Sequence, residues 1–172
     1  MGYLYPNLMV GSRSNAMVFS TSDESLRGVP MSDGVVGDYK RVTLDADAKN
    51  WAYLYVGGVD AVGDVPEGTG LVISLFARVD GGPCNFVPTI RRGDGMHLMH
   101  DYGTTTWEDV GGGWTLCVTR AKRNSVAYDS QVLYVGLALG KAGTTYDLAQ
   151  PMVCVADVPH AWAPAAGEVW PE

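Results

Sequence analysis

Apolar and polar residues alternate over short runs along most of this chain, and no run keeps helical spacing over about 11 residues. The clearest alternation is LVISLFARVD at 71–80, whose odd-numbered positions are all apolar. Side chains point alternately to the two faces of a strand, so this run predicts a strand with one face in the core. The sequence WTLCVTR at 114–120 alternates in the same way and predicts a second such strand.

Residues 51–59 alternate aromatic with aliphatic side chains. In a strand, Trp51, Tyr53 and Tyr55 would lie on one face and the aliphatic residues on the other. One of these faces must be the core face, and the alternation alone leaves open which one.

The remaining runs complete an all-β pattern. Residues 21–34 are polar or rich in Gly, Pro and Asp, so we expect a loop there, and the Asp94-Gly95 pair predicts a tight hairpin. About nine or ten strands, with turns roughly every 8 to 12 residues, predict an antiparallel β-sandwich or jelly roll rather than a parallel α/β sheet. The further expected strands are 16–20, 35–44, 86–92, 96–100, 131–140 and 145–156.

Composition agrees with this class and adds one point about the surface. The chain has 22 glycines and 9 prolines among 172 residues, a mix that interrupts short strands with turns. Charged residues make up 18%, against about 25% in a typical globular protein, which indicates that part of the surface faces protein neighbours. The length suits one domain, expected at 1–164, followed by a C-terminal tail at 165–172.

Charge and hydropathy exclude two classes of partner. The net charge is −7 and the basic residues are scattered, whereas phosphate binding needs clustered Lys and Arg, so we expect no nucleic-acid partner. The sequence nowhere has the roughly 18 consecutive apolar residues that span a bilayer, so we expect no membrane insertion. No secretory signal is evident at the N-terminus.

The cysteines indicate a protein that folds in a reducing compartment. Cys84, Cys117 and Cys154 form an odd set at wide spacing without a CxxC pair, which favours neither a zinc site nor a full disulfide framework. Cys117 and Cys154 lie in apolar runs, where a free cysteine acts as a small buried hydrophobe.

No motif for catalysis or metal binding stands out, so we predict no enzyme activity and no cofactor. His97 and His100 would point to opposite faces of a strand and cannot share a metal ion there. The sequence has no G-x-S-x-G elbow, and the acids at 45–67 are typical of turns. A structural calcium ion held by such loop oxygens is left open.

Four segments resemble jelly-roll modules of bacteriophage tail and fibre proteins. Asn7-Leu8-Met9 is similar to their opening, and the PMVCVADVPHAWAP sequence at 151–164 to their closing segment. Between these lie the SLFAR sequence at 74–78 and GGGWTLCVT at 111–119, which are similar to two of their strands. The resemblance implies a jelly roll like those of galactose-binding and carbohydrate-binding modules, in which Trp114 and Trp162 fill the core and hold the closing segment.

The resemblance also implies a setting and a partner. We expect a non-enzymatic virion component, assembled in the host cytoplasm as a tail-fibre, baseplate or head-fibre module. Its work would be attachment to a host cell-surface glycan or to a neighbouring virion protein. Because fibres are symmetric and often trimeric, a homotrimer is expected.

Aromatic side chains are the residues most suited to a glycan, because sugars stack their C–H faces on flat rings beside a few polar groups. One candidate set is Trp51, Tyr53 and Tyr55. The other is Tyr102, Trp107 and Glu108. For each of them the competing interpretation is that strand aromatics simply pack in the core.

Two alternative functions fit the same pattern. One is the carbohydrate-binding module of a secreted glycoside hydrolase, although no linker or catalytic region accompanies it. The other is a decoration protein that binds no sugar. The fold alone does not separate these functions.

Overall fold

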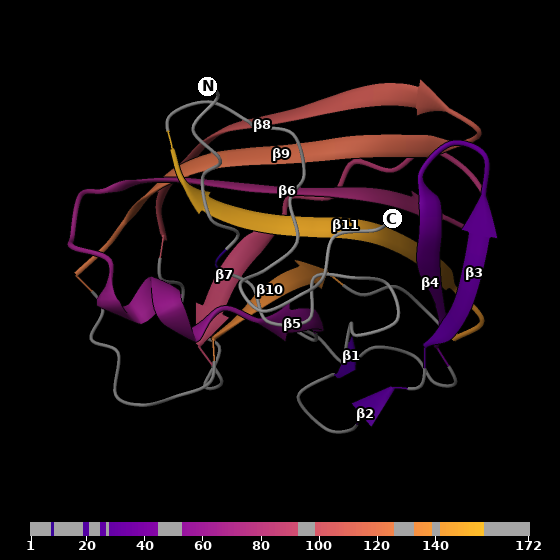
Figure 1. Ribbon diagram of the computed structural model, residues 1–172, viewed down its shortest axis with the longest axis horizontal. Coiled ribbons are helices and arrows are strands. Elements are labelled where there is room, and N and C mark those ends of the chain that lie inside the picture. The colour runs from indigo at the N-terminus through magenta and orange to yellow at the C-terminus, as the bar shows by residue number, and fades with distance from the viewer. Residues whose placement is uncertain are drawn as a thin grey trace, which may run out of the picture.

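The computed structural model describes residues 8, 19–20, 25–26, 28–44, 53–92, 99–125, 133–138 and 142–156. Only the backbone is described at 19–20, 25–26, 53–55, 57–58, 60, 91–92, 99–104 and 133–138. Within these ranges the protein is all-β and antiparallel, with one short 3-10 helix, η1, at Asp60–Asp64. Its strands form two sheets (Figure 1).

The larger sheet has six strands in the order β3-β4-β11-β6-β9-β8. The smaller has five strands in the order β2-β1-β5-β10-β7. In Figure 1 the long strands β8, β9, β6 and β11 lie side by side, and the β3–β4 hairpin stands across their end. The six-stranded sheet consists of β3 (Val29–Asp33), β4 (Gly37–Thr43), β11 (Thr145–Val155), β6 (Gly70–Val79), β9 (Trp114–Arg123) and β8 (Met99–Gly111). The five-stranded sheet consists of β2 (Ser25–Leu26), β1 (Phe19–Ser20), β5 (Tyr53–Gly58), β10 (Leu133–Ala138) and β7 (Thr89–Arg92).

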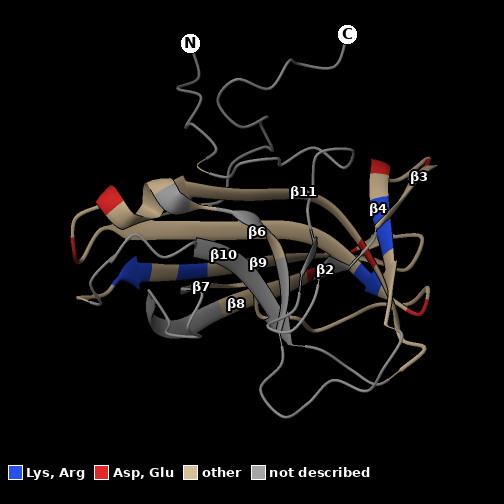
Figure 2. Cartoon of the chain, turned by 90° about the horizontal axis from the view of Figure 1, so that it is seen from below, with Lys and Arg blue, Asp and Glu red and all other residues tan. Residues whose placement is uncertain are grey.

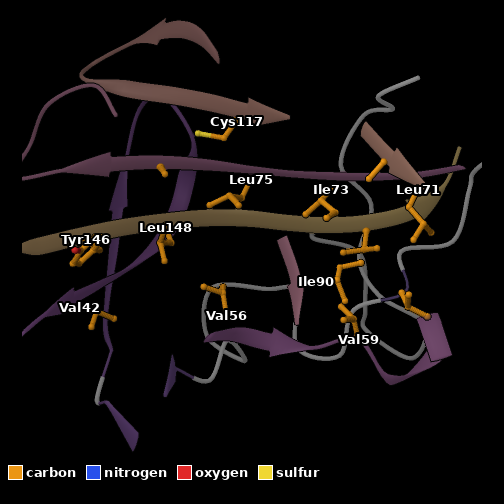
Figure 3. Packing of buried hydrophobic residues seen from close by; sticks show 14 of the residues in the cluster. Val42, Val56, Val59, Leu71, Ile73, Leu75, Ile90, Cys117, Tyr146 and Leu148 are labelled. Carbon is orange, nitrogen blue, oxygen red and sulfur yellow. The ribbon is translucent and has the colours of Figure 1, made fainter. Parts of the chain in front are cut away.

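The two sheets share one hydrophobic core (Figure 3). Strand β6 contributes the apolar odd-numbered face that its sequence predicts, with Leu71, Ile73, Leu75 and Ala77 all at most 1% exposed. The smaller sheet contributes Val56 and Ile90, and the segment around η1 contributes Val59 and Val62. Burial of this shared face is the main favourable contribution to folding.

The outer face of the six-stranded sheet is also buried over its central strands. One cluster there contains Val72, Val118, Met152 and Cys154. A second contains Val36, Tyr39, Trp114 and Ala149. The central strands are therefore apolar on both faces, which explains why β11 reads as a nearly continuous apolar run.

Strand β11 lies between β4 and β6 and changes register halfway along its length. The irregularity falls between Ala149 and Met152, where Gln150 has a φ of 48° and Pro151 follows. The Gln150 side-chain amide Nε2 donates to the Val36 carbonyl at 3.0 Å, which fixes this bulge. Beyond it, the Leu8 amide donates to the Val153 carbonyl at 2.8 Å, so the N-terminal region reaches the closing strand.

Most predicted strands are confirmed, with two corrections. Residues 21–34 are not a loop, because β2 and β3 lie within them and β3 pairs with β4 along its full length. The Asp33 Oδ1 atom accepts the amides of Val35 and Val36 at 3.0 and 3.1 Å, so the Asp-Gly sequence here makes the turn of a hairpin. Since Val29 and Met31 are exposed, β3 has no buried apolar face that alternation could reveal.

The second correction concerns the hairpin expected at Asp94-Gly95. The two flanking strands do not pair with each other, because β7 pairs with β10 in one sheet and β8 with β9 in the other. The chain therefore crosses between sheets here. Strand β8 is also longer than predicted and extends to Gly111. The Asp94-Gly95 pair itself lies outside the described residues, as do 157–164 with Trp162 and the expected tail at 165–172.

No helix among the described residues is long and apolar enough to cross a membrane.

Candidate functional site

Trp107 is the one aromatic residue of the two candidate sets whose side chain the structure describes. It lies on β8, the edge strand of the six-stranded sheet, directly opposite Cys117 of β9. Opposed residues of an antiparallel pair share a face, and Cys117 belongs to the core, so Trp107 is on the core-side face of the sheet. Its side chain is nevertheless 47% exposed, because it lies at the sheet edge.

A hydrogen bond fixes the indole of Trp107. Its Nε1–H donates to the Phe86 carbonyl at 2.7 Å. Phe86 belongs to the segment Pro83–Pro88, here named loop 83–88, and its ring stacks on buried Tyr146 at 5.7 Å between centroids. The indole is thus attached to the core through one loop residue while almost half of its surface faces solvent. We name Trp107 with loop 83–88 the Trp107 platform.

Polar groups flank the ring on the same face of β8. Thr105 and Asp109 lie two residues to either side of Trp107, which is roughly 7 Å along a strand. The Thr105 hydroxyl is hydrogen bonded to that of Thr119 at 3.1 Å, and Asp109 Oδ1 accepts the Gly111 amide at 2.8 Å. A fixed, half-exposed aromatic ring between a hydroxyl and a carboxylate is an arrangement that can stack a sugar and orient its hydroxyl groups.

The structure separates Trp107 from the acid predicted beside it. Glu108 lies opposite Leu116, which packs against the outer-face cluster, so Glu108 and Trp107 are on opposite faces of the sheet. They cannot bind one ligand together on a single face. Tyr102 belongs to β8, but its side chain lies outside the described residues.

The other aromatic set belongs to the five-stranded sheet. Tyr53 and Tyr55 are in β5, where only their backbone is described, and Trp51 lies outside the described residues. Val56, from the aliphatic side of the alternation, is fully buried in the core. This identifies the core face that the sequence left open. Because β5 and β8 are in different sheets, the two candidate sets do not form one site through strand pairing.

A charged cluster on the outer face of the six-stranded sheet escaped the sequence analysis. Register places Asp147 of β11 beside Arg41 of β4 and Arg78 of β6. Asp147 is 1% exposed, and its oxygens accept from Arg41 Nε at 2.7 Å, Arg41 Nη2 at 2.9 Å and Arg78 Nε at 2.7 Å. Figure 2 shows the basic residues of β4 in blue and an acidic residue in red at one end of the same strand. The only sequence signal was the charge of Arg78 and Asp147 inside apolar strands.

Arg78 extends this cluster to four further groups, one of which is the Asp33 carboxylate, 3.3 Å from Arg78 Nη1. Its Nη2 donates to the Tyr39 hydroxyl and its Nη1 to the Gly112 carbonyl, both at 3.0 Å. Its guanidinium carbon lies 4.4 Å from the centre of the Trp114 ring, a cation–π distance. Trp114 is fully buried and its Nε1 donates to Asp33 Oδ2 at 2.7 Å, so it fills the outer-face cluster rather than the shared core.

The electrostatics of this cluster favour the charged forms. Burial alone would raise the pKa of Asp147, but hydrogen bonds from Arg41 and Arg78 outweigh it and lower the pKa below its ordinary value of 3.8. Burial would also raise the pKa of Asp33, but hydrogen bonds from the Val36 amide and the Trp114 indole outweigh this effect and lower the pKa. Because each charge has its partners within the protein, the cluster has the chemistry of a structural ion-pair network rather than of a ligand-binding site.

The described residues contain no group of three or more His, Cys, Asp or Glu side chains that could hold a metal ion. His97 lies outside the described residues, and only the backbone of His100 is described. Of the loop acids considered for calcium, Asp45 and Asp47 also lie outside them, so the calcium expectation remains untested.

Among comparisons with known proteins, only the comparison with solved structures gives a match. No protein-family model matches the chain, and no curated protein matches it. Among solved structures, the tripod (BppUct-A-L) from the baseplate of bacteriophage Tuc2009 is similar, with a TM-score of 0.52 and 12% sequence identity. The match covers 97% of this chain and 61% of that one. At this identity the likeness shows that the chain has the all-β fold of part of that phage protein.

Proposed function

We propose that this chain is a non-enzymatic structural component of a bacteriophage virion, built as a jelly-roll β-sandwich in a baseplate, tail fibre or head fibre. The observation that carries the proposal is the fold likeness to a baseplate tripod over 97% of this chain. The segments that resemble phage jelly-roll modules support it from the sequence, because Leu8, 74–78, 111–119 and 151–155 all belong to the same sheet or contact it.

The partner that this proposal implies is another virion protein, with three copies of the chain forming the unit. The similar phage structure is called a tripod, a name that indicates three equivalent parts. The low proportion of charged residues suits a surface that is covered by neighbouring proteins. Exposed apolar side chains on β3, Val29 at 53% and Met31 at 37%, lie on an edge strand where a neighbouring chain can pack.

Solution mass tests the assembly. One chain has a mass of 18.4 kDa, so light scattering of the purified protein should give about three times this value, 3 × 18.4 = 55.2 kDa. Antibodies raised against the chain should also label purified phage particles in electron micrographs. A stable 18.4 kDa monomer would overturn the trimer, and particles without label would overturn the virion assignment.

A host-surface glycan is a second candidate partner, and the Trp107 platform is the observation that favours it. The ring is 47% exposed and oriented by the 2.7 Å hydrogen bond to Phe86. Such preorganisation lowers the entropy lost on binding a sugar. The two alternative functions differ in whether they require a sugar-binding site. A carbohydrate-binding module of a hydrolase requires one, whereas a decoration protein does not.

A glycan array with matched variants tests the platform. Trp107→Ala should abolish binding, whereas Trp107→Phe should keep part of it because a ring remains. Glu108→Gln is the control, because it changes an exposed side chain on the opposite face of the same strand. Equal binding by all four proteins would remove Trp107 from the site, and no binding by the wild type would favour the decoration protein.

A further inference from the structure

Cys84, which belongs to the Trp107 platform, and Cys117 form a pair of free thiols. Their Sγ atoms are 4.0 Å apart, although 33 residues separate them in the sequence. Cys84 lies in loop 83–88 and Cys117 in β9, where it is fully buried in the shared core (Figure 3). A disulfide needs a sulfur–sulfur distance of about 2.05 Å, so closing the gap requires a shift of about 2 Å.

Local contacts hold Cys84 towards its partner. Its amide donates to the Thr115 hydroxyl at 3.2 Å, and Thr115 is on the same strand as Cys117. Its thiol donates to the Ala77 carbonyl at 3.5 Å, on the neighbouring strand β6. Cys84 itself is outside the regular strands, so its side chain can rotate without breaking a ladder hydrogen bond.

The two thiols differ in access and acidity. Cys84 is partly exposed, whereas Cys117 is not exposed at all. The hydrogen bond with Cys117 lowers the pKa of Cys84 to about 7, and the Phe86 amide and Thr115 hydroxyl assist against the effect of burial. The same hydrogen bond, together with burial, raises the pKa of Cys117. The reachable thiol is therefore also the one that supplies a thiolate near neutral pH.

We propose that Cys84 is a site of thiol–disulfide exchange with small disulfides such as oxidised glutathione, and that Cys117 resolves the adduct into an internal Cys84–Cys117 disulfide. This inference does not depend on the proposed function.

The chemistry proceeds in two balanced exchanges. The Cys84 thiolate attacks one sulfur of oxidised glutathione, forming the mixed disulfide and releasing glutathione thiolate, which takes up a proton. The Cys117 sulfur then attacks the Cys84 sulfur, and the proton of Cys117 passes to the departing glutathione thiolate, which gives a second glutathione molecule. In total the two protein thiols are oxidised, and one oxidised glutathione is reduced to two glutathione molecules.

The bond would attach loop 83–88 covalently to β9. Phe86 in that loop holds the Trp107 indole, so oxidation would fix the base of the platform. Cross-links that close loops of this length stabilise proteins chiefly by restricting the unfolded chain. For a protein of this size we expect the melting temperature to rise by roughly 10 °C on oxidation.

Intact-mass analysis of the full chain tests the proposal. The reduced protein, treated with oxidised glutathione at pH 8, should first gain one glutathione and then lose it, ending lighter than at the start by two hydrogen atoms. Proteolytic mapping should show Cys84 linked to Cys117. Cys117→Ala should stop at the glutathione adduct on Cys84, and Cys84→Ala should form neither product.

Cys154 provides the matched control. It is buried on the other face of the sheet, where burial raises its pKa to about 11, so Cys154→Ala should behave as the wild type does. A wild-type protein that stays fully reduced would overturn the inference, as would an adduct on Cys84 that never converts to the internal disulfide. Mapping is done on the wild type, so the result stands even if a variant fails to fold.

Discussion

Arg78 and Asp147 lie directly opposite each other on β6 and β11, and Arg78 Nε donates to Asp147 Oδ2 at 2.7 Å. The carboxylate is 1% exposed and receives Arg41 from its other side. A charge this deeply buried is tolerated only because it is paired and fully hydrogen bonded. The pair therefore joins three adjacent strands, β4, β11 and β6, through side chains as well as through their backbones.

Removing the carboxylate should be strongly destabilising. Asp147→Asn removes the carboxylate that Arg41 and Arg78 share, although Asp33 Oδ2 still lies 3.3 Å from Arg78 Nη1. Breaking such a buried cluster costs about 3 kcal/mol of unfolding free energy. Urea denaturation followed by circular dichroism measures this loss. Glu108→Gln, at an exposed position, should change stability by less than about 0.5 kcal/mol. A similarly small effect for Asp147→Asn would mean that the cluster contributes nothing to stability.

Stability should fall in acid because of the same carboxyl group. The pKa of Asp147 is lower in the folded protein than its ordinary value of 3.8, so the unfolded chain takes up its proton first as the pH falls. The stabilisation is complete above this value and is lost as the pH falls through the folded pKa, at no more than about 1.4 kcal/mol per pH unit. Denaturation curves between pH 6 and 2.5 would show the decline, with flat stability above about pH 5. A flat profile through the acid range would contradict it.

The contact between two turns makes Gly113 sensitive to any side chain. Gly113 has a φ of 78°, and a Cβ atom there would lie 2.5 Å from the Gly81 carbonyl oxygen. Gly113→Ala should lose about 3 kcal/mol, combining left-handed strain with a backbone clash. Gly143→Ala is the control, because its φ is 81° but no atom lies within 4 Å of the added Cβ. It should lose only about 1 kcal/mol. Chemical denaturation measures both losses of unfolding free energy. Equal losses for the two variants would show that the two turns can move apart and relieve the clash at Gly113.

Strands with one buried face could be predicted from the sequence, and those without one could not. The alternation at 71–80 predicted β6 because Leu71, Ile73 and Leu75 are all core residues. Strand β3 was missed because Val29 and Met31 face solvent, and its place depends on pairing with β4. The hairpin at Asp94-Gly95 was wrong because a turn signal is local, whereas the partners of β7 and β8 are set by contacts distant in the sequence.

The candidate site shows the same limit. The sequence indicated Trp107 as a binding residue, and the structure shows it half-exposed, but Glu108 is on the other face because successive strand residues alternate. The Arg41–Asp147–Arg78 cluster needed the register of three strands, two of them more than 60 residues away in sequence from the third. Cys84 and Cys117 likewise meet only because loop 83–88 folds back on β9.

Removal of the ring should cost much more stability at one of two tryptophans on neighbouring strands than at the other. Trp114 is fully buried between Tyr39 and Arg78, so Trp114→Ala should lose about 4 kcal/mol of unfolding free energy. Trp107 is 47% exposed and leaves no closed cavity, so Trp107→Ala should lose less than about 1.5 kcal/mol. Denaturation of both variants, each compared with the wild type, measures the difference. A loss for Trp107→Ala as large as that for Trp114→Ala would make Trp107 a packing residue and withdraw its surface from the proposed glycan site.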